Sequence, residues 1–321
     1  MNDPAKQPID IEEQRMWLMD HRTATGFTWS EIAKRIGVKV GTISQFGSEK
    51  GYAGDEARIA DAVFRYRQQI AQLATLGTAL PEKPGYFETP SSLQLMGLLH
   101  YAKEFGRIVL GATGAGVGKS ETAKHLQVCF PNVFHAEMSP SSAGVNTMQL
   151  ELLRVMGDRT SKGTPQALTW RIRDLLRGLG KPLIIIDEAQ HLSQKAIDEI
   201  RGWNDKTGVG IAFLGNIEVL KQIDGSSKDN AFAQLSSRVA MRMKRAIPLR
   251  ADAIALAHAW KIFDDDLVEQ IVRISLHPGG LRGTTYTLES AFMTASSEGR
   301  MITVDDIQSA WAQRRAHGGA A

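Results

Sequence analysis

The pattern of apolar and polar positions divides the chain into a helical first part, an alternating middle part and a helical last part. In the middle part, short continuous apolar runs alternate with segments in which apolar residues recur at helical spacing. The runs that predict strands are residues 107–111, 133–137, 183–187, 209–215 and 243–249. Continuous apolar strands separated by helices are typical of an α/β fold, a doubly wound parallel sheet with helices on both faces.

The last part of the chain, residues 251–321, contains no strand-like run. Apolar residues recur at helical spacing in residues 253–260, 265–276, 281–295 and 304–314. Short helices of this kind are too small to be stable alone and must pack on one another. We therefore expect a C-terminal helical domain.

The first part, residues 1–76, is also expected to be helical, and it contains a helix-turn-helix pattern. Residues 28–38 and 40–46 form two short helical segments around a tight turn at Gly37, a residue type that tolerates the left-handed conformation. Ile43 and Phe46 would pack back onto the first of these helices. The polar residues that would then face outward, as major-groove readers do, are Thr42, Ser44 and Gln45. A helical hairpin used for protein contacts is the alternative interpretation.

A segment rich in proline and glycine follows the first part. Pro81, Pro84, Gly85 and Pro90 lie in it, and proline cannot sustain the interior of a helix. Such segments commonly connect domains. The predicted organisation is a helix-turn-helix domain at residues 1–76, a linker at 77–94, an α/β core at 95–250 and a helical domain at 251–321.

A glycine-rich segment lies between the first predicted strand of the core and a segment of helical spacing. Glycines let backbone N–H groups point at phosphate oxygens, and the helix N-terminus adds its positive dipole end. In such a phosphate-binding loop, or Walker A motif, Lys119 reaches the β- and γ-phosphates of ATP and the Ser120 hydroxyl binds Mg²⁺. The residues expected to hold the nucleotide are Gly114, Ala115, Gly116, Val117, Gly118, Lys119, Ser120 and Glu121.

The loop departs from the strict Walker A pattern at one position, where Thr113 stands in place of the first glycine. Gly111 and Gly114 flank this threonine, so the loop is still expected to turn. A glycine-rich turn that holds no ligand is the alternative interpretation of this segment.

An acidic strand end supports the nucleotide interpretation. Residues 183–187 form a continuous apolar run that ends in Asp187, and Glu188 follows directly. A strand of this composition is typical of a parallel sheet that is buried on both faces. At its carboxyl end Asp187 would hold Mg²⁺ and Glu188 would activate the attacking water. The two segments together predict an ATPase that uses ATP and Mg²⁺.

Composition narrows the class of protein further. The chain has 321 residues, of which 43% are hydrophobic and 23% charged, as in globular proteins. No apolar run approaches the ~20 residues needed to span a bilayer, and the polar N-terminus shows no signal peptide. A single cysteine, Cys129, excludes an internal disulfide. We expect a cytoplasmic protein without a membrane partner, and the formal charge of +3 is too small to indicate nucleic acid by itself.

The order of these parts resembles AAA+ ATPases and, more narrowly, the Mu B family of transposition ATPases. The segments that carry this resemblance are residues 41–44, 80–89, 116–120, 184–192, 214–216, 237–242 and 278–282, and they span nearly the whole chain. The resemblance implies an AAA+ fold with a C-terminal helical subdomain and an N-terminal helix-turn-helix domain.

The resemblance also implies further site residues. Asn216 follows a strand and stands where the family has a polar sensor that helps to orient the attacking water. Arg238 is expected to be the arginine finger, which reaches the ATP of a neighbouring subunit; Arg242 and Arg245 are alternatives for this role. Arg282 resembles the second sensor, which contacts nucleotide from the C-terminal domain.

The function implied by the resemblance is ATP-dependent binding of double-stranded DNA with little sequence preference. The chain would assemble on DNA as a helical oligomer and deliver that target to a DNA transposase, and hydrolysis would release it, which provides target immunity. Arg159 and Lys162 are candidates for the DNA-facing inner surface. A helicase loader of the AAA+ class and a helix-turn-helix transcriptional regulator with a nucleotide switch are the alternatives.

Overall fold

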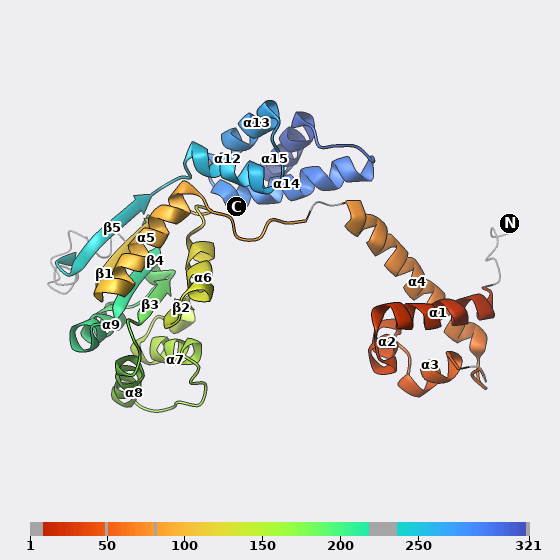
Figure 1. The fold of residues 1–321 in the computed structure, drawn as a ribbon, viewed down its shortest axis with the longest axis horizontal. Coiled ribbons are helices and arrows are strands. Elements are labelled where there is room, and N and C mark those ends of the chain that lie inside the picture. Colours follow the sequence, from red (N-terminus) through yellow and green to blue (C-terminus); the bar gives the residue numbers. More distant parts are fainter. Residues whose placement is uncertain (1–8, 49–50, 80–81, 218–235, 319–321) are drawn as a thin grey trace. The chain divides into compact units, whose positions relative to one another are not determined.

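The computed structural model describes residues 9–48, 51–79, 82–217 and 236–318. These residues belong to two compact units, one within residues 1–80 and the other within residues 81–321 (Figure 1). The model describes no helix that is both long and apolar enough to cross a membrane. Each unit is described by itself below.

The first unit is helical. Its helices are α1 (Ile11–Thr25), α2 (Trp29–Ile36), α3 (Val40–Phe46) and α4 (Glu56–Ala79). Thr28 and Glu31 form a capping box that begins α2, and Gly37 ends α2 in the left-handed conformation with φ 80°. Ile43 and Phe46 of α3 are fully buried in a cluster that includes α2 residues. Two short helices around a glycine turn are therefore present, as the spacing predicted.

The second unit is built on a five-stranded parallel sheet in the order β2-β3-β4-β1-β5. The strands are β1 (Ile108–Thr113), β2 (Val133–Glu137), β3 (Leu183–Asp187), β4 (Gly210–Gly215) and β5 (Val239–Arg245). One face packs against α5 (Pro90–Phe105) and α6 (Lys119–Cys129), and the other packs against α7 (Val145–Val155), α8 (Pro165–Arg177) and α9 (Gln194–Thr207). The predicted parallel α/β fold with helices on both faces is confirmed.

Helices at the end of the chain form a separate apolar cluster in this unit. They are α12 (Arg250–Ala259), α13 (Asp265–Ser275), α14 (Gly280–Ser297) and α15 (Val304–Gly318). Phe87, from the segment before α5, packs against their core, and Tyr86 stacks on His125 of α6 with ring centroids 3.7 Å apart. Residues 82–89 are therefore packed against both α6 and the C-terminal helices.

Some predicted boundaries were wrong. The strand predicted at residues 243–249 is β5, which begins at Val239 and ends at Arg245. β5 is an edge strand on which only Val239 and Met243 are buried. It therefore contains polar residues and does not form the continuous apolar run that predicts a strand. The predicted linker at 77–94 also loses its last residues to α5, because Pro90 occupies the first turn of that helix, where proline fits.

One buried carboxylate joins the sheet unit to its C-terminal helices. Asp252 of α12 is fully buried and accepts hydrogen bonds from the backbone N–H of Ser91 (2.8 Å), the Ser91 hydroxyl (2.5 Å) and the backbone N–H of Leu249 (2.7 Å). It thus satisfies one backbone N–H group at the N-terminus of each of α5 and α12.

Replacing Asp252 by Ala is expected to destabilise this unit by about 3 kcal/mol, because buried donors lose their acceptor. Urea denaturation followed by circular dichroism would measure the shift. Asp305→Ala is the matched control, since Asp305 is an exposed aspartate in the first turn of α15. Equal midpoints for the two variants would contradict the anchoring role of Asp252.

Candidate nucleotide site

The glycine-rich loop connects β1 to α6 at the carboxyl end of the sheet. Gly116 and Gly118 have φ values of 77° and 96°, and Gly118 directly precedes the first residue of α6. A Cβ added at Gly114 would lie 1.9 Å from the carbonyl oxygen of Ala246, so only glycine fits there. Thr113, which replaces the expected first glycine, is the buried last residue of β1. The departure from the strict pattern therefore falls within the strand, and the turn begins at Gly114.

The loop is in direct contact with the N-terminus of α14. The backbone N–H of Leu281 donates to the carbonyl oxygen of Gly116 at 2.9 Å. A Cβ at Gly116 would lie 2.0 Å from the carbonyl oxygen of Gly279, and one at Gly280 would lie 2.9 Å from the Gly116 carbonyl oxygen. This backbone approach brings Arg282, on the first turn of α14, to the loop.

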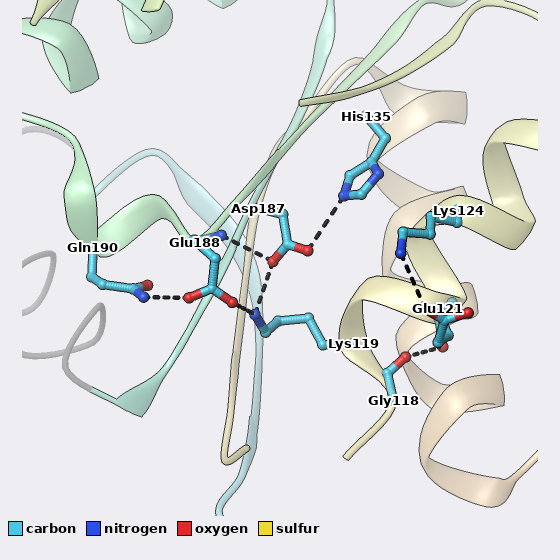
Figure 2. Close-up of polar contacts among 9 residues, drawn as sticks. Gly118, Lys119, Glu121, Lys124, His135, Asp187, Glu188 and Gln190 are labelled. Carbon is cyan, nitrogen blue, oxygen red and sulfur yellow. Dashed lines mark hydrogen bonds and ion pairs between the residues drawn. The ribbon is translucent and has the colours of Figure 1, made fainter. Parts of the chain in front are cut away.

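Two carboxylates meet the side chain of Lys119 (Figure 2). The Lys119 ammonium donates to Asp187 Oδ1 at 2.8 Å and to Glu188 Oε1. His135 Nε2, from β2, lies 3.3 Å from Asp187 Oδ2. The site therefore holds the partly buried ammonium group of Lys119 between the end of β3 and the start of α6.

Burial by itself opposes charge on both Lys119 and Asp187, but their partners outweigh it. The pKa of Asp187 is held well below its ordinary range, because the hydrogen bond from His135, the charge of Lys119 and hydrogen bonds from Lys119 and Ser120 exceed the cost of desolvation. The pKa of Lys119 is raised, because the charge of Asp187 and hydrogen bonds to both carboxylates exceed its own desolvation. The pair is ionised at neutral pH.

A cavity of about 700 Å³ lies over the loop, within the size range of small-ligand sites. Its large apolar lining residues outside the loop are Tyr86, Phe87, Leu256, Trp260, Leu281 and Tyr286. They come from residues 82–89, α14 and the end of α12, whereas the polar lining comes mainly from the loop. The cavity thus has a glycine-rich part suited to phosphate and an apolar part suited to a planar base.

The residues at the loop also fit a magnesium ion. The Ser120 hydroxyl helps to lower the pKa of Asp187, so a hydroxyl and a carboxylate lie near one another beside the loop. Among the described residues there is no cluster of three or more histidine, cysteine, aspartate or glutamate side chains that could hold a metal alone. Magnesium in nucleotide sites takes few protein ligands and completes its shell with phosphate oxygens and water, so the pair is sufficient.

Most of the predicted site residues meet at this cavity. Its lining includes Gly114 to Glu121 of the loop together with Glu188, Asn216 and Arg282. Asp187 lies behind them, in contact with Lys119. Glu121 is exposed and its side chain pairs with Lys124. These residues come from segments far apart in the sequence, and the sheet brings them to one edge.

Arg238 does not lie at this cavity. It precedes β5, whose register with β1 pairs Val239 with Ile108, so it lies at the edge of the sheet where β1 begins. The loop follows the opposite end of β1, and the 7 residues of β5 span roughly 20 Å. The Arg238 side chain is 48% exposed and pairs with Asp205 of α9. Arg238 therefore cannot contact a nucleotide bound to its own loop.

The alternative arginines are placed differently. Arg242, in the middle of β5, donates hydrogen bonds to the carbonyl oxygen and hydroxyl of Ser236. Arg245, the last residue of β5, donates to Gln94 and lies beside the loop, where its carbonyl oxygen accepts from the N–H of Gly114. Of these arginines, Arg238 is nearest the edge remote from its own loop.

The residues predicted to contact DNA lie in both units. Thr42 and Ser44 are partly buried on α3, and Gln45 is exposed there. Arg159 and Lys162 are exposed in the loop between α7 and α8. Asp158 orders this loop by accepting hydrogen bonds from residues 160, 161 and 171. Arg159 and Lys162 are therefore exposed on the same loop.

Two polar residues of the site were not predicted to act there. His135 lies in the middle of β2, and no local motif distinguishes it from an ordinary histidine. Gln190 follows the acidic pair, but its importance depends on contacts with Glu188 and with the residue after β4. Only the pairing of β2 with β3 and of β3 with β4 places these side chains.

The fold and the site define a P-loop ATPase of the AAA class, and the comparisons agree. A family model described as an AAA domain matches residues 108–223, and one described as Mu B transposition protein, C terminal, matches residues 237–313. The chain is 31% identical to the ATP-dependent target DNA activator B of Escherichia phage Mu, over 88% of this chain and 89% of that protein. The chain belongs to the Mu B family of transposition ATPases.

A further relative and a structural neighbour were also found. The Mu-like prophage FluMu DNA transposition protein B of Haemophilus influenzae is 27% identical over 84% of this chain and 93% of that protein. Domain III of the replication initiation protein DnaA of Thermotoga maritima is a structural neighbour, with 13% identity, a TM-score of 0.47, and coverage of 71% of this chain and 94% of that one. The AAA domain model and the similarity to the target DNA activators confirm the predictions of an ATPase and of its family.

Proposed function

We propose that this ATPase binds double-stranded DNA in an ATP-dependent way and delivers it as target to a DNA transposase. The observation that carries the proposal is the similarity to target DNA activators along nearly the whole chain, combined with an intact Lys119, Asp187 and Glu188 cluster at the cavity. A chain that had kept only the DNA-binding role would not need a paired lysine and two carboxylates over a phosphate-binding loop.

The polar residues at the loop and at the ends of β3 and β4 have defined roles in this proposal. The backbone of residues 114–118 and the Lys119 ammonium bind the phosphates, and Ser120 and Asp187 hold Mg²⁺, which supplies charge stabilisation when bound. Glu188 accepts the proton of the attacking water and Asn216 orients that water. Arg282 contacts the nucleotide from α14, so the direct contact between Gly116 and α14 links nucleotide to the position of the C-terminal helices.

Assembly completes the active site. Arg238 lies at the edge of the sheet opposite its own loop, and an arginine there meets ATP only if it belongs to a neighbouring subunit. A head-to-tail contact of this kind repeats into a ring or a helix. The assembly runs along DNA as a helical filament, and hydrolysis weakens both the subunit contact and the hold on DNA. Release of the filament near a bound transposase gives target immunity.

DNA is held by residues of both units in this proposal. Arg159 and Lys162 contact phosphates in the filament, which makes binding largely independent of sequence and strongly dependent on salt. Thr42, Ser44 and Gln45 on α3 provide a second contact, in which α2 and α3 act as a helix-turn-helix.

The proposal predicts filaments on a long arbitrary duplex with ATP, and none with ADP or without nucleotide, by electron microscopy. The variant Arg159→Ala/Lys162→Ala is expected to weaken DNA binding by about tenfold and to reduce its salt dependence. Arg273→Ala is the matched control, an exposed arginine of α13. Adding a transposase tests delivery.

Discrete, nucleotide-independent footprints at a few sequences would contradict the proposal and favour a transcriptional regulator. A strong preference for single-stranded DNA would instead favour a helicase loader. Each result differs from that of a nonspecific, ATP-gated filament.

A further inference from the structure

The backbone at Glu188 is held in an uncommon conformation. Glu188 has φ 53° and ψ 40°, in the left-handed region that is unfavourable for a non-glycine residue. Its backbone N–H donates to Asp187 Oδ1 at 2.9 Å. This conformation turns the Glu188 side chain, which is 31% exposed, toward the cavity that it lines. Such a backbone conformation persists only where the surrounding structure stabilises it, and it is typical of functional sites.

Both oxygens of the Glu188 carboxylate have a partner. Oε1 accepts from the Lys119 ammonium, and Oε2 accepts from the side-chain amide of Gln190. Figure 2 shows Lys119 and Gln190 on opposite sides of the carboxylate. In the proposed reaction the Lys119 ammonium binds the phosphates. Oε1 of Glu188 is then free to accept from water, while Oε2 keeps its hydrogen bond with Gln190.

The side-chain amide of Gln190 also contacts the residue that follows β4. Gln190 Oε1 accepts from the backbone N–H of Asn216 at 3.4 Å, and Asn216 directly follows β4. One glutamine side chain therefore connects the carboxylate after β3 with the residue after β4. Glutamine suits this place because its amide carries a donor and an acceptor at one end.

We propose that Gln190 is a positioning residue for ATP hydrolysis, which orients Glu188 and fixes its separation from Asn216. The proposal rests on the proposed function, in which Glu188 is the base and Asn216 orients water. Gln190 is not among the described residues that line the cavity, so it acts through its neighbours and not on the nucleotide. Its removal therefore changes turnover and leaves nucleotide binding intact.

Three substitutions separate hydrogen bonding from packing. Gln190→Met keeps the length of the side chain without a hydrogen-bonding end, Gln190→Ala removes it, and Gln190→Glu keeps its shape but places a carboxylate against Glu188. A packing role predicts that Glu is tolerated better than Ala. The positioning role predicts that Glu is at least as damaging as Met, because it has no donor and repels Glu188.

The experiment measures steady-state kcat and KM for ATP with the full chain on duplex DNA, together with ATP affinity and the thermal unfolding midpoint. We expect kcat to fall about tenfold to a hundredfold in Gln190→Met, with KM within about twofold of wild type. The matched control is Gln194→Met, since the Gln194 side chain donates to Asp198 and lies outside the cavity lining.

The outcomes separate the inference from the function on which it rests. An unchanged or increased kcat in Gln190→Met, or a loss of kcat matched by a loss of ATP affinity, would overturn the positioning role. Tolerance of Glu with damage by Ala would show a packing role and overturn it too. If wild type does not turn over ATP, or Glu188→Gln does so normally, the proposed role of Glu188 fails first.

Discussion

Replacing Glu188 by Gln is expected to lower kcat for ATP hydrolysis by about a hundredfold to a thousandfold while ATP binding is retained. The amide has the shape of the carboxylate but cannot accept the proton of water. Lys119 keeps its contact with Asp187, so the phosphate-binding end of the cavity is preserved. Single-turnover hydrolysis and ATP affinity, measured on the same preparation, test the expected loss of hydrolysis and the expected retention of ATP binding.

The structure provides a matched control for this variant. Glu137 is an exposed carboxylate at the end of β2, in register with Asp187 at the same edge of the sheet, but it does not line the cavity. Glu137→Gln changes the same charge nearby and is expected to hydrolyse ATP at the wild-type rate. Filaments of Glu188→Gln should persist on DNA in ATP after wild-type filaments have dissociated. Rapid dissociation of Glu188→Gln filaments would show that release from DNA does not depend on ATP hydrolysis.

Replacing Arg238 by Ala is expected to lower DNA-stimulated hydrolysis by about a thousandfold, because charge on the transferring phosphoryl group loses its guanidinium. Affinity for ATP should change little, since Arg238 lies at the edge of the sheet remote from its own loop. Arg250→Ala is the control, an exposed arginine that is likewise paired with a carboxylate, that of Glu269. ATPase assays with saturating duplex DNA measure the effect.

Mixing inactive variants tests whether Arg238 acts between subunits. Lys119→Ala lacks the phosphate-binding lysine but keeps Arg238, and Arg238→Ala has the reverse defect. A mixture should recover activity that neither variant has alone, because some contacts combine an intact loop with an intact arginine. Repeating the mixture with Arg242→Ala and Arg245→Ala identifies the finger. Recovery with one of those variants, and none with Arg238→Ala, would transfer the role.

The parts of the fold that could be predicted are those with a local signal. The continuous apolar run of β3 and the helical spacing of α12 to α15 were correct in kind and nearly correct in extent. The end of β5 was wrong because an edge strand carries polar residues on its exposed face, and the apolar residues after it belong to the turn into α12. A local pattern of apolar residues indicates how a segment is buried. It does not identify a strand such as β5 when only one face of that strand is buried.

The candidate site divides in the same way. Lys119, Ser120, Asp187 and Glu188 belong to short motifs whose chemistry depends on neighbours in sequence, so the residues alone indicated a nucleotide site. His135 acts through Asp187 on the neighbouring strand, and Gln190 connects Glu188 with Asn216 after β4. Nothing in the sequence around either residue distinguishes it. The apolar part of the cavity, which includes Tyr86 and Tyr286, likewise forms only because residues 82–89 and α14 meet over the loop.

The sequence by itself determined the parallel α/β core, the phosphate-binding loop, the acidic strand end and the family to which the chain belongs. These depend on residues close together in the chain, where backbone conformation and periodic burial leave a readable pattern. Only the tertiary structure decided that Gly116 touches α14, that one glutamine connects Glu188 with Asn216, and that Arg238 lies at the opposite edge of the sheet. Those relations depend on strand order and register, which join residues that the sequence keeps far apart.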